Sequence, residues 1–171
     1  MPLDLSVVVP LFNEEESVRP LYAAIVAGVE PLGVSFEIVL VDDGSREGTV
    51  RIADAIARAD PRVCLVKFRR NYGQTPAMAA GIAEARGEII VTMDGDLQND
   101  PADIGGLLAR MDEGNDIVVG WRHDRQDKLW TRKVPSRIAN ALIAKVTGVP
   151  IRDNGCSLKA YRACLIKQIP L

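Results

Sequence analysis

The chain has 171 residues, of which 47% are hydrophobic and 26% charged, and its formal net charge at pH 7 is −2. This length fits one domain with a substantial core and leaves no room for a second full domain. The composition is that of an ordinary globular protein, and the charge gives no reason to expect a nucleic acid partner. No run of 18 apolar residues occurs, so we expect no segment of this sequence to span a membrane.

Short apolar runs rich in valine and isoleucine alternate with longer segments of helical period. This pattern predicts an α/β fold with a mostly parallel sheet, helices on both of its faces, and ligands outside the carboxyl ends of its strands. In chain order the predicted elements are strand 5–10, helix 14–30, strand 36–42, helix 48–59, strand 62–68, helix 74–86, strand 88–93, helix 102–112, strand 116–120 and helix 134–147.

Polar residues precede four of these helices and are candidate caps. We interpret Glu15 and Glu16 as acidic residues of a first helical turn, where the helix dipole favours negative charge. The capping candidates are Asn13, Ser45 or Thr49, Thr75 before Pro76, and Asp100 before Pro101.

The three cysteines are odd in number and lack the paired spacing of a zinc site. The N-terminus carries no basic region followed by an apolar stretch and a cleavage site. Both observations predict reduced thiols in a cytoplasmic protein. The cysteines are Cys64, Cys156 and Cys164.

The most informative motif is Asp94-Gly95-Asp96, which follows the apolar run 88–93. Side chains two apart on a strand share a face, and a glycine between them lets the backbone approach a ligand. Carboxylate oxygens suit Mg²⁺ or Mn²⁺, which leave coordination positions for substrate phosphates. Such triplets also occur in solvated turns, but polar residues end two further strands, at 13–16 and 42–45. We therefore predict one shared crevice that holds a metal-bound diphosphate.

Several motifs together resemble the family-two nucleotide-sugar glycosyltransferases, whose Rossmann-like fold is called GT-A. These motifs are Pro10-Leu-Phe-Asn-Glu-Glu15, Val41-Asp-Asp-Gly-Ser45, Asp94-Gly-Asp-Leu-Gln98 and Gly120-Trp-Arg122. Segments 125–128, 132–136 and 153–162 resemble the polyprenyl-phosphate members, including dolichol-phosphate mannose synthases and undecaprenyl-phosphate aminoarabinose transferases. The resemblance covers about residues 5–166. It implies one GT-A catalytic domain over residues 1–171, shortened at its C-terminus because relatives commonly continue into further helices.

Carried onto matching positions, the resemblance implies that the donor nucleotide borders Pro10, Phe12, Asn13 and Glu14, with Asp43 near the base or ribose. Many relatives have tyrosine where this chain has Phe12. The missing hydroxyl removes a polar contact from that position and leaves ring or backbone packing.

The resemblance also places Asp94, Asp96 and Gln98 around the metal and the diphosphate. The chemistry agrees, because a divalent cation can offset the charge that builds on a departing diphosphate. Gln98 offers a neutral carbonyl oxygen, although an exposed turn amide is the alternative interpretation. The predicted cofactor is Mg²⁺ or Mn²⁺.

Residues 122–137 hold six basic and two acidic residues in an acidic protein. Such a segment binds phosphate oxygens and also gains from anionic lipid head groups. The resemblance places Arg122, Arg132 and Ser136 at the acceptor phosphate. Three of the other four cations, Arg125, Lys128 and Arg137, are interpreted as solvated.

A phosphate acceptor has a second pKa of about 6 and is largely dianionic near neutral pH, so it needs no strong general base. Asp153 matches the acidic position that the family offers as a base, and we assign it a positioning or proton-accepting role. The alternative is a turn-forming aspartate beside Asn154-Gly155.

Together these features predict a metal-dependent inverting glycosyltransferase that transfers a sugar from a nucleoside diphosphate to a polyprenyl phosphate at the cytoplasmic face of the membrane. The expected partners are the nucleotide sugar, the polyprenyl phosphate and the membrane surface, with a membrane subunit or a second copy of the chain as further candidates. The resemblance of segment 153–162 to the aminoarabinose transferases implies a uridine donor.

Three alternatives remain. The same donor site could serve a polysaccharide or another hydroxyl acceptor. A phosphoreceiver-like sensor would need an acceptor aspartate and a lysine at later strand ends, for which Val66-Lys67 fits poorly. A dinucleotide-binding enzyme is weaker still, because no Gly-x-Gly-x-x-Gly follows the first strand.

Overall fold

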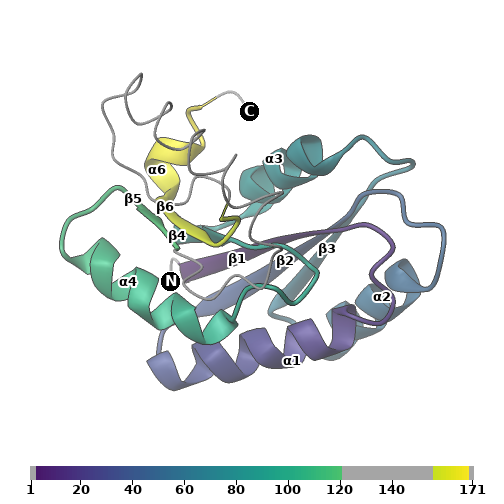
Figure 1. Cartoon of the computed structure of the whole chain (residues 1–171), viewed down its shortest axis with the longest axis horizontal. Helices are drawn as coiled ribbons and strands as arrows, with labels where there is room; N and C mark the ends of the chain where they lie inside the picture. Colours follow the sequence, from purple (N-terminus) through teal and green to yellow (C-terminus); the bar gives the residue numbers. More distant parts are fainter. Residues whose placement is uncertain (1–2, 121–155, 170–171) are drawn as a thin grey trace, which may run out of the picture.

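The computed structural model describes residues 3–120 and 156–169, and within them six strands form one sheet in the order β3-β2-β1-β4-β6-β5 (Figure 1). The strands are β1 (Leu3–Leu11), β2 (Phe36–Asp42), β3 (Val63–Lys67), β4 (Gly87–Thr92), β5 (Ile117–Val119) and β6 (Lys159–Arg162). The helices are α1 (Val18–Val29), α2 (Thr49–Ala59), α3 (Gln74–Glu84), α4 (Ile104–Asp112) and α6 (Ala163–Ile166), with 3-10 turns η1 (Glu30–Leu32) and η2 (Pro101–Asp103).

The sheet is mostly parallel, as predicted. Strand β1 pairs in parallel with β2 and β4, and β2 pairs in parallel with β3. Only β6, among the described strands, runs antiparallel to its neighbours β4 and β5. The carboxyl ends of β1 to β5 and the beginning of β6 therefore lie at one edge of the sheet.

Strand β6 was not predicted from the sequence. It has four residues, and both of its terminal residues, Lys159 and Arg162, are charged. Its position is set by pairing with β4, which joins Ile90 to Tyr161 and Val91 to Ala160. A strand defined by distant partners leaves little periodic signal in its own residues.

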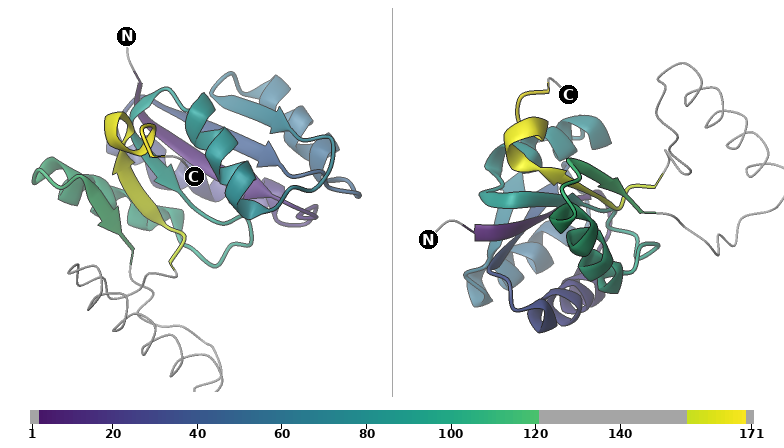
Figure 2. Two further views of the ribbon diagram at one scale, coloured as in Figure 1. Left: turned by 90° about the horizontal axis from the view of Figure 1, so that it is seen from above. Right: turned by 90° about the vertical axis from the view of Figure 1, so that its left-hand side faces the viewer.

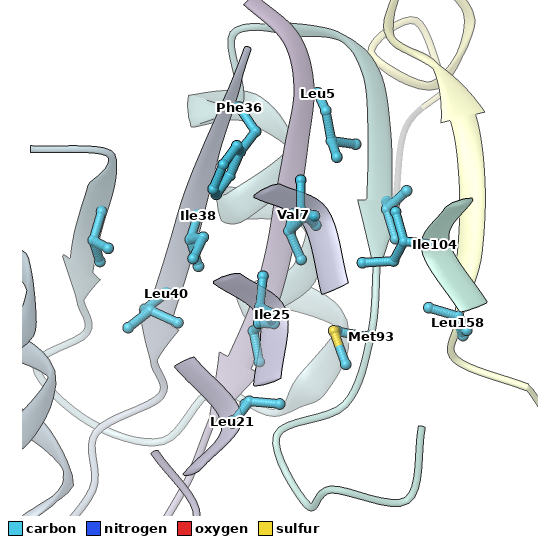
Figure 3. Packing of buried hydrophobic residues seen from close by; sticks show 14 of the residues in the cluster. Leu5, Val7, Leu21, Ile25, Phe36, Ile38, Leu40, Met93, Ile104 and Leu158 are labelled. Atoms are coloured by element: carbon cyan, nitrogen blue, oxygen red, sulfur yellow. The ribbon is translucent and has the colours of Figure 1, made fainter. Parts of the chain in front are cut away.

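Alternation along the buried strands divides the core into two clusters, one on each face of the sheet. Val7 and Val9 pack with α1, α2 and α4, whereas Val8 packs with α3 and α6. Figures 1 and 2 show these helices on opposite faces, and Figure 3 shows Leu21 and Ile25 of α1 over the strand residues of the larger cluster. The prediction of helices on both faces is confirmed.

The largest difference from the predicted helix boundaries is at the start of α1. Helix α1 begins at Val18, not at residue 14, and its first turn holds no acidic residue. The backbone of Asn13 is left-handed, with φ of 55°, so the chain turns before the helix can begin. The interpretation of Glu15 and Glu16 as first-turn residues is therefore wrong.

Of the predicted caps, Asp100 caps the 3-10 turn η2 that precedes α4, because its Oδ1 accepts a hydrogen bond of 2.9 Å from the N–H of Ala102. Gly48 and Gly73 occupy the cap positions of α2 and α3 without a side-chain bond, and Ser17 occupies that of α1. The caps predicted at Thr75 and Asn13 are therefore wrong. The helix predicted near 134–147 lies outside the described residues. Among the helices that are described, none has the length and apolar character needed to cross a membrane.

Candidate active site

The loops that follow β1 and β2 are joined by hydrogen bonds from the polar residues that the sequence singled out. The N–H of Asn13 donates to Oγ of Ser45, and Oδ1 of Asn13 accepts from the N–H of Arg46, both at 3.0 Å. The N–H of Glu14 donates to Oγ1 of Thr49 at 2.8 Å. Ser45 and Thr49, proposed as helix caps, instead bind the loop after β1.

Glu15 also takes part in the hydrogen bonds that join the loops after β1 and β2. Its Oε2 accepts a hydrogen bond of 3.0 Å from the N–H of Gly48, and its own N–H donates to Glu47 at 3.2 Å. The guanidinium of Arg51 lies 3.6 Å from the other carboxylate oxygen. Glu15 thus fixes the start of α2 from the loop after β1. The position at which α2 starts therefore depends on tertiary contacts.

The two aspartates at the end of β2 are both buried and hold different loops. Oδ2 of Asp42 accepts from the N–H groups of Gly44 and Ser45, at 3.0 and 3.1 Å. The carboxylate of Asp43 accepts from the N–H groups of Tyr72 and Gly73, at 2.7 and 2.8 Å. Asp43 therefore fixes the segment between β3 and α3, and its predicted contact with the base or ribose stays a prediction.

A hollow of about 450 Å³ opens between the loop after β2 and the loop after β3. Four cations contribute to its wall, and two of them have partners: Lys67 lies 3.2 Å from Asp54, and Arg70 stacks on the ring of Tyr72 at 4.9 Å. This excess of positive charge suits an anionic or carbonyl-rich ligand. The lining residues are Asp42, Gly44, Ser45, Arg46, Val50, Lys67, Phe68, Arg69, Arg70 and Asn71.

The Asp94-Gly95-Asp96 motif lies in the loop that follows β4, because the strand ends at Thr92. The argument that two strand residues share a face is therefore wrong for this pair. A Cβ at Gly95 would lie 2.8 Å from a Leu11 methyl group and 3.1 Å from the Pro10 carbonyl oxygen. A side chain here would force Leu11 to shift where the loop packs on the end of β1, so the glycine serves a contact with protein rather than with ligand.

Within this loop each aspartate uses one oxygen and keeps the other open. Oδ1 of Asp94 accepts a hydrogen bond of 2.7 Å from Nε2 of Gln74, and Oδ1 of Asp96 accepts one of 3.1 Å from the N–H of Gln98. No other hydrogen bond or ion pair reaches either carboxylate from the part of the chain that the structure describes. Asp94 is half-buried, whereas Asp96 and Gln98 are exposed.

The described residues contain no group of three or more His, Cys, Asp or Glu side chains arranged to hold a metal ion. Two carboxylates with open oxygens nevertheless suit Mg²⁺ or Mn²⁺ when substrate phosphates complete the coordination. The donor set fits a cation that is shared with a diphosphate and does not fit a closed, all-protein site.

Two contacts of the loop after β4 were missed by sequence reasoning. The first is the Gln74 bond to Asp94, across 20 positions. The second joins the same loop to the segment before β6: Nδ2 of Asn99 donates to Oγ of Ser157 at 2.8 Å. Oγ1 of Thr92 also donates to the carbonyl oxygen of Ser157, at 2.9 Å. Neither contact has a spacing signal in the sequence.

The predicted acceptor residues Arg122, Arg132 and Ser136, and the candidate base Asp153, lie outside the described residues. Pro10 is half-buried at the end of β1, and Phe12 and Asn13 are exposed just beyond it. The carboxyl ends of β1, β2 and β4 thus bring the donor-site and metal-site candidates to one edge of the sheet.

A parallel sheet with polar loops and two open carboxylates at its carboxyl edge is the architecture of a Rossmann-like α/β domain that binds its ligand at that edge. The chain belongs to glycosyl transferase family 2, whose model matches residues 6–169.

Its relatives include a dodecaprenyl-phosphate galacturonate synthase from Rhizobium johnstonii, 49% identical over 99% of this chain and 51% of the relative. Another is an undecaprenyl-phosphate 4-deoxy-4-formamido-L-arabinose transferase from Pseudomonas aeruginosa, 44% identical over 97% of this chain and 49% of the relative. The chain spans about half the length of the curated relatives it matches.

Among solved structures, glucosyl-3-phosphoglycerate synthase from Mycobacterium tuberculosis, in complex with Mn²⁺, uridine diphosphate and phosphoglyceric acid, matches with a TM-score of 0.76. It is 22% identical, and the match covers 99% of this chain and 59% of that one. The predicted GT-A fold is confirmed.

Proposed function

We propose that this chain is the catalytic domain of a metal-dependent inverting glycosyltransferase that transfers a sugar from a nucleoside diphosphate to a polyprenyl phosphate. The observation that carries the proposal is the edge where β1, β2 and β4 end, at which Asp94 and Asp96 each keep an open oxygen. Family membership supports the donor class, and the names of the Rhizobium and Pseudomonas relatives support the acceptor class.

In this proposal Asp94, Asp96 and Gln98 hold Mg²⁺ or Mn²⁺ against the donor diphosphate. A bound cation would act as a Lewis acid that offsets the charge developing on the leaving diphosphate. The chain's own contribution is a pair of carboxylates presented from a loop that is packed against the end of β1. The Mn²⁺ in the mycobacterial structure supports a divalent ion in this class of fold.

The nucleotide would lie along the loop after β1, bordered by Pro10, Phe12, Asn13 and Glu14, with the Asp43 loop behind it. The ring of Phe12 is 43% exposed and available for packing against a base or ribose. The neighbouring cationic hollow offers guanidinium donors to carbonyl and phosphate oxygens. The resemblance of segment 153–162 to aminoarabinose transferases favours a uridine donor.

The acceptor assignment extends the proposal to Arg122, Arg132 and Ser136, which would bind the polyprenyl phosphate, and to Asp153 as a positioning or proton-accepting group. An inverting reaction follows from in-line attack by the acceptor phosphate on the anomeric carbon. Because the acceptor is a lipid, the enzyme would work at the cytoplasmic face of the membrane, where the basic segment 122–137 meets anionic head groups.

The direct test incubates the purified protein with Mn²⁺, UDP or GDP sugars and a short-chain polyprenyl phosphate. We expect a lipid-linked sugar, and we expect the double variant Asp94→Asn/Asp96→Asn to lose both this product and metal-dependent donor binding. The proposal is overturned if donors bind with Mn²⁺ but neither sugar transfer nor donor hydrolysis occurs.

The second candidate keeps the donor site and uses a hydroxyl group of a polysaccharide as acceptor. Arg132→Ala separates the two functions. A large loss of turnover with polyprenyl phosphate, at unchanged donor affinity, supports the lipid acceptor, whereas unchanged turnover favours the hydroxyl acceptor.

A further inference from the structure

Gln74 is the first residue of α3, and its amide group reaches across to the loop after β4. Its Nε2 lies 2.7 Å from Oδ1 of Asp94, within the range of a strong hydrogen bond to a carboxylate. Gln74 is exposed and Asp94 is half-buried, so the contact forms at the surface of the candidate donor site. It is the one hydrogen bond to Asp94 from the described residues.

The two residues that precede Gln74 are held by Asp43. The Asp43 carboxylate accepts from the N–H groups of Tyr72 and Gly73, at 2.7 and 2.8 Å. Gly73 has a φ of 100°, a conformation that glycine adopts without strain, and it precedes α3 directly. A chain of hydrogen bonds therefore runs from the end of β2, through the start of α3, to the loop after β4.

The hydrogen bond leaves the two oxygens of Asp94 in different states. Oδ1 is occupied by the amide, and Oδ2 has no hydrogen bond or ion pair from the described part of the chain. The donor is a neutral amide, so Asp94 and Asp96 keep their full negative charge for a divalent cation. A lysine in this place would also orient the carboxylate but would compete with the cation for its charge.

We propose that Gln74 is a positioning residue of the donor site, whose amide fixes the Asp94 carboxylate so that Oδ2 is the oxygen offered to the divalent cation. The inference rests on the proposed function, because the cation is that of the nucleotide-sugar complex. Gln74 touches neither the cation nor the sugar in this role. It lowers the cost of ordering Asp94 when the complex binds.

The test compares Gln74→Met with the wild-type protein. Methionine has a similar length and helix propensity but no N–H donor. We expect the dissociation constant of UDP or GDP in the presence of Mn²⁺ to rise about tenfold, as for a lost hydrogen bond to a charged group. Affinity for the same nucleotide in EDTA and the melting temperature of the unliganded protein should stay unchanged. Isothermal titration calorimetry and calorimetric unfolding measure these quantities.

Gln168→Met is the matched control, because the Gln168 amide is also exposed and donates to a carbonyl oxygen, that of Cys164, at 2.7 Å. It should leave nucleotide binding unchanged. Gln74→Lys provides a second variant, which restores a donor but adds positive charge. It should weaken Mn²⁺-dependent binding and strengthen binding in EDTA.

Wild-type affinity in both Gln74 variants, or an equal loss of affinity with and without Mn²⁺, would overturn the positioning role while leaving the donor site in place. A wild-type protein that shows no Mn²⁺-dependent binding of UDP or GDP would overturn the proposed function as well. In the transfer reaction, Gln74→Met should raise KM for the donor more than it lowers kcat.

Discussion

Nδ2 of Asn99 lies 2.8 Å from Oγ of Ser157, and this bond ties the loop that carries Asp94 and Asp96 to the chain entering β6. Asn99 is 7% exposed, so its amide has little access to water. The residues on either side of this bond are 58 positions apart. The geometry of the metal-site loop therefore depends on a segment from the far end of the described chain.

Ser157→Ala removes the acceptor and leaves a buried amide N–H unpaired. We expect a loss of about 1–3 kcal/mol in the free energy of unfolding. Thermal unfolding should show this as a lower melting temperature, at about 2–4 °C per kcal/mol for a protein of this size. Asn115→Ala is the control, because Asn115 is exposed and bonds only locally to the Arg110 carbonyl oxygen. Equal melting temperatures for both variants would contradict the prediction.

Glu37 is a buried carboxylate on β2 that accepts hydrogen bonds from Ser6 Oγ at 2.7 Å and from Arg86 Nε at 2.8 Å. Burial by itself raises the pKa of Glu37, but the hydrogen bonds from Arg86 and Ser6 outweigh it and hold the pKa below its usual value. Glu37→Gln turns one acceptor into a donor that faces other donors. We expect it to cost about 2 kcal/mol at neutral pH.

The pH dependence of that cost has a defined sign. Because the folded-state pKa of Glu37 is lowered, its stabilisation is complete above the unfolded value of about 4.3 and disappears as pH falls through the folded value. The free energies of unfolding of the wild-type and Glu37→Gln proteins, measured with denaturant from pH 7 to acid pH, should therefore converge as the pH falls. A constant difference across this range would refute the assignment. The Glu113→Gln variant, which alters an exposed ion pair with Arg110, should show a small difference throughout.

Tyr22 on α1 donates a hydrogen bond of 2.7 Å to Oδ2 of Asp60. This bond, followed by burial and the charge of Asp60, raises the pKa of Tyr22 above its usual value of 10.0. Tyr22→Phe should cost about 1 kcal/mol at pH 7. A raised folded pKa gives stability that is complete below the unfolded value and is lost as pH rises through the folded one. The difference in free energy of unfolding between wild type and Tyr22→Phe should therefore be smaller under alkaline conditions than at pH 7. The control variant Tyr72→Phe should stay close to wild type at pH 7.

Gly44 connects the loops after β2 and β3 by close contact. Its φ is 72°, and a Cβ there would lie 2.6 Å from both the Arg70 Cα and the Asn71 backbone nitrogen. Gly44→Ala should therefore destabilise the protein by more than about 1 kcal/mol and weaken nucleotide binding at the neighbouring hollow.

Gly106 in α4 gives the opposite prediction, because a Cβ there would meet nothing within 4 Å. Gly106→Ala should stabilise the protein by about 0.5–1 kcal/mol through helix propensity. Melting temperatures that move in opposite directions for the two variants would support both assignments. A destabilised Gly106→Ala, or an unaffected Gly44→Ala, would contradict the packing described here.

The buried strands could be predicted because a run of apolar residues is visible in the local sequence. The run from Leu5 to Val9 is fully buried and forms the centre of the sheet, as its composition indicates. The position of Asp94 and Asp96 just beyond a buried strand was predictable for the same reason. What failed was the geometry of that pair, because the strand ends at Thr92 and Leu97 takes a left-handed backbone with φ of 61°.

The sequence by itself determined the class of fold, the family, and which polar clusters gather at the carboxyl edge, because apolar periodicity and motif order are carried by neighbouring residues. Only the tertiary structure decided what each polar group binds. The side chains of Asn13 and Glu15 form hydrogen bonds with the loop after β2. The Asp43 carboxylate binds the backbone just before α3, and the Gln74 amide binds Asp94. These hydrogen bonds join residues 20 to 33 positions apart, so no local pattern of residues specifies them.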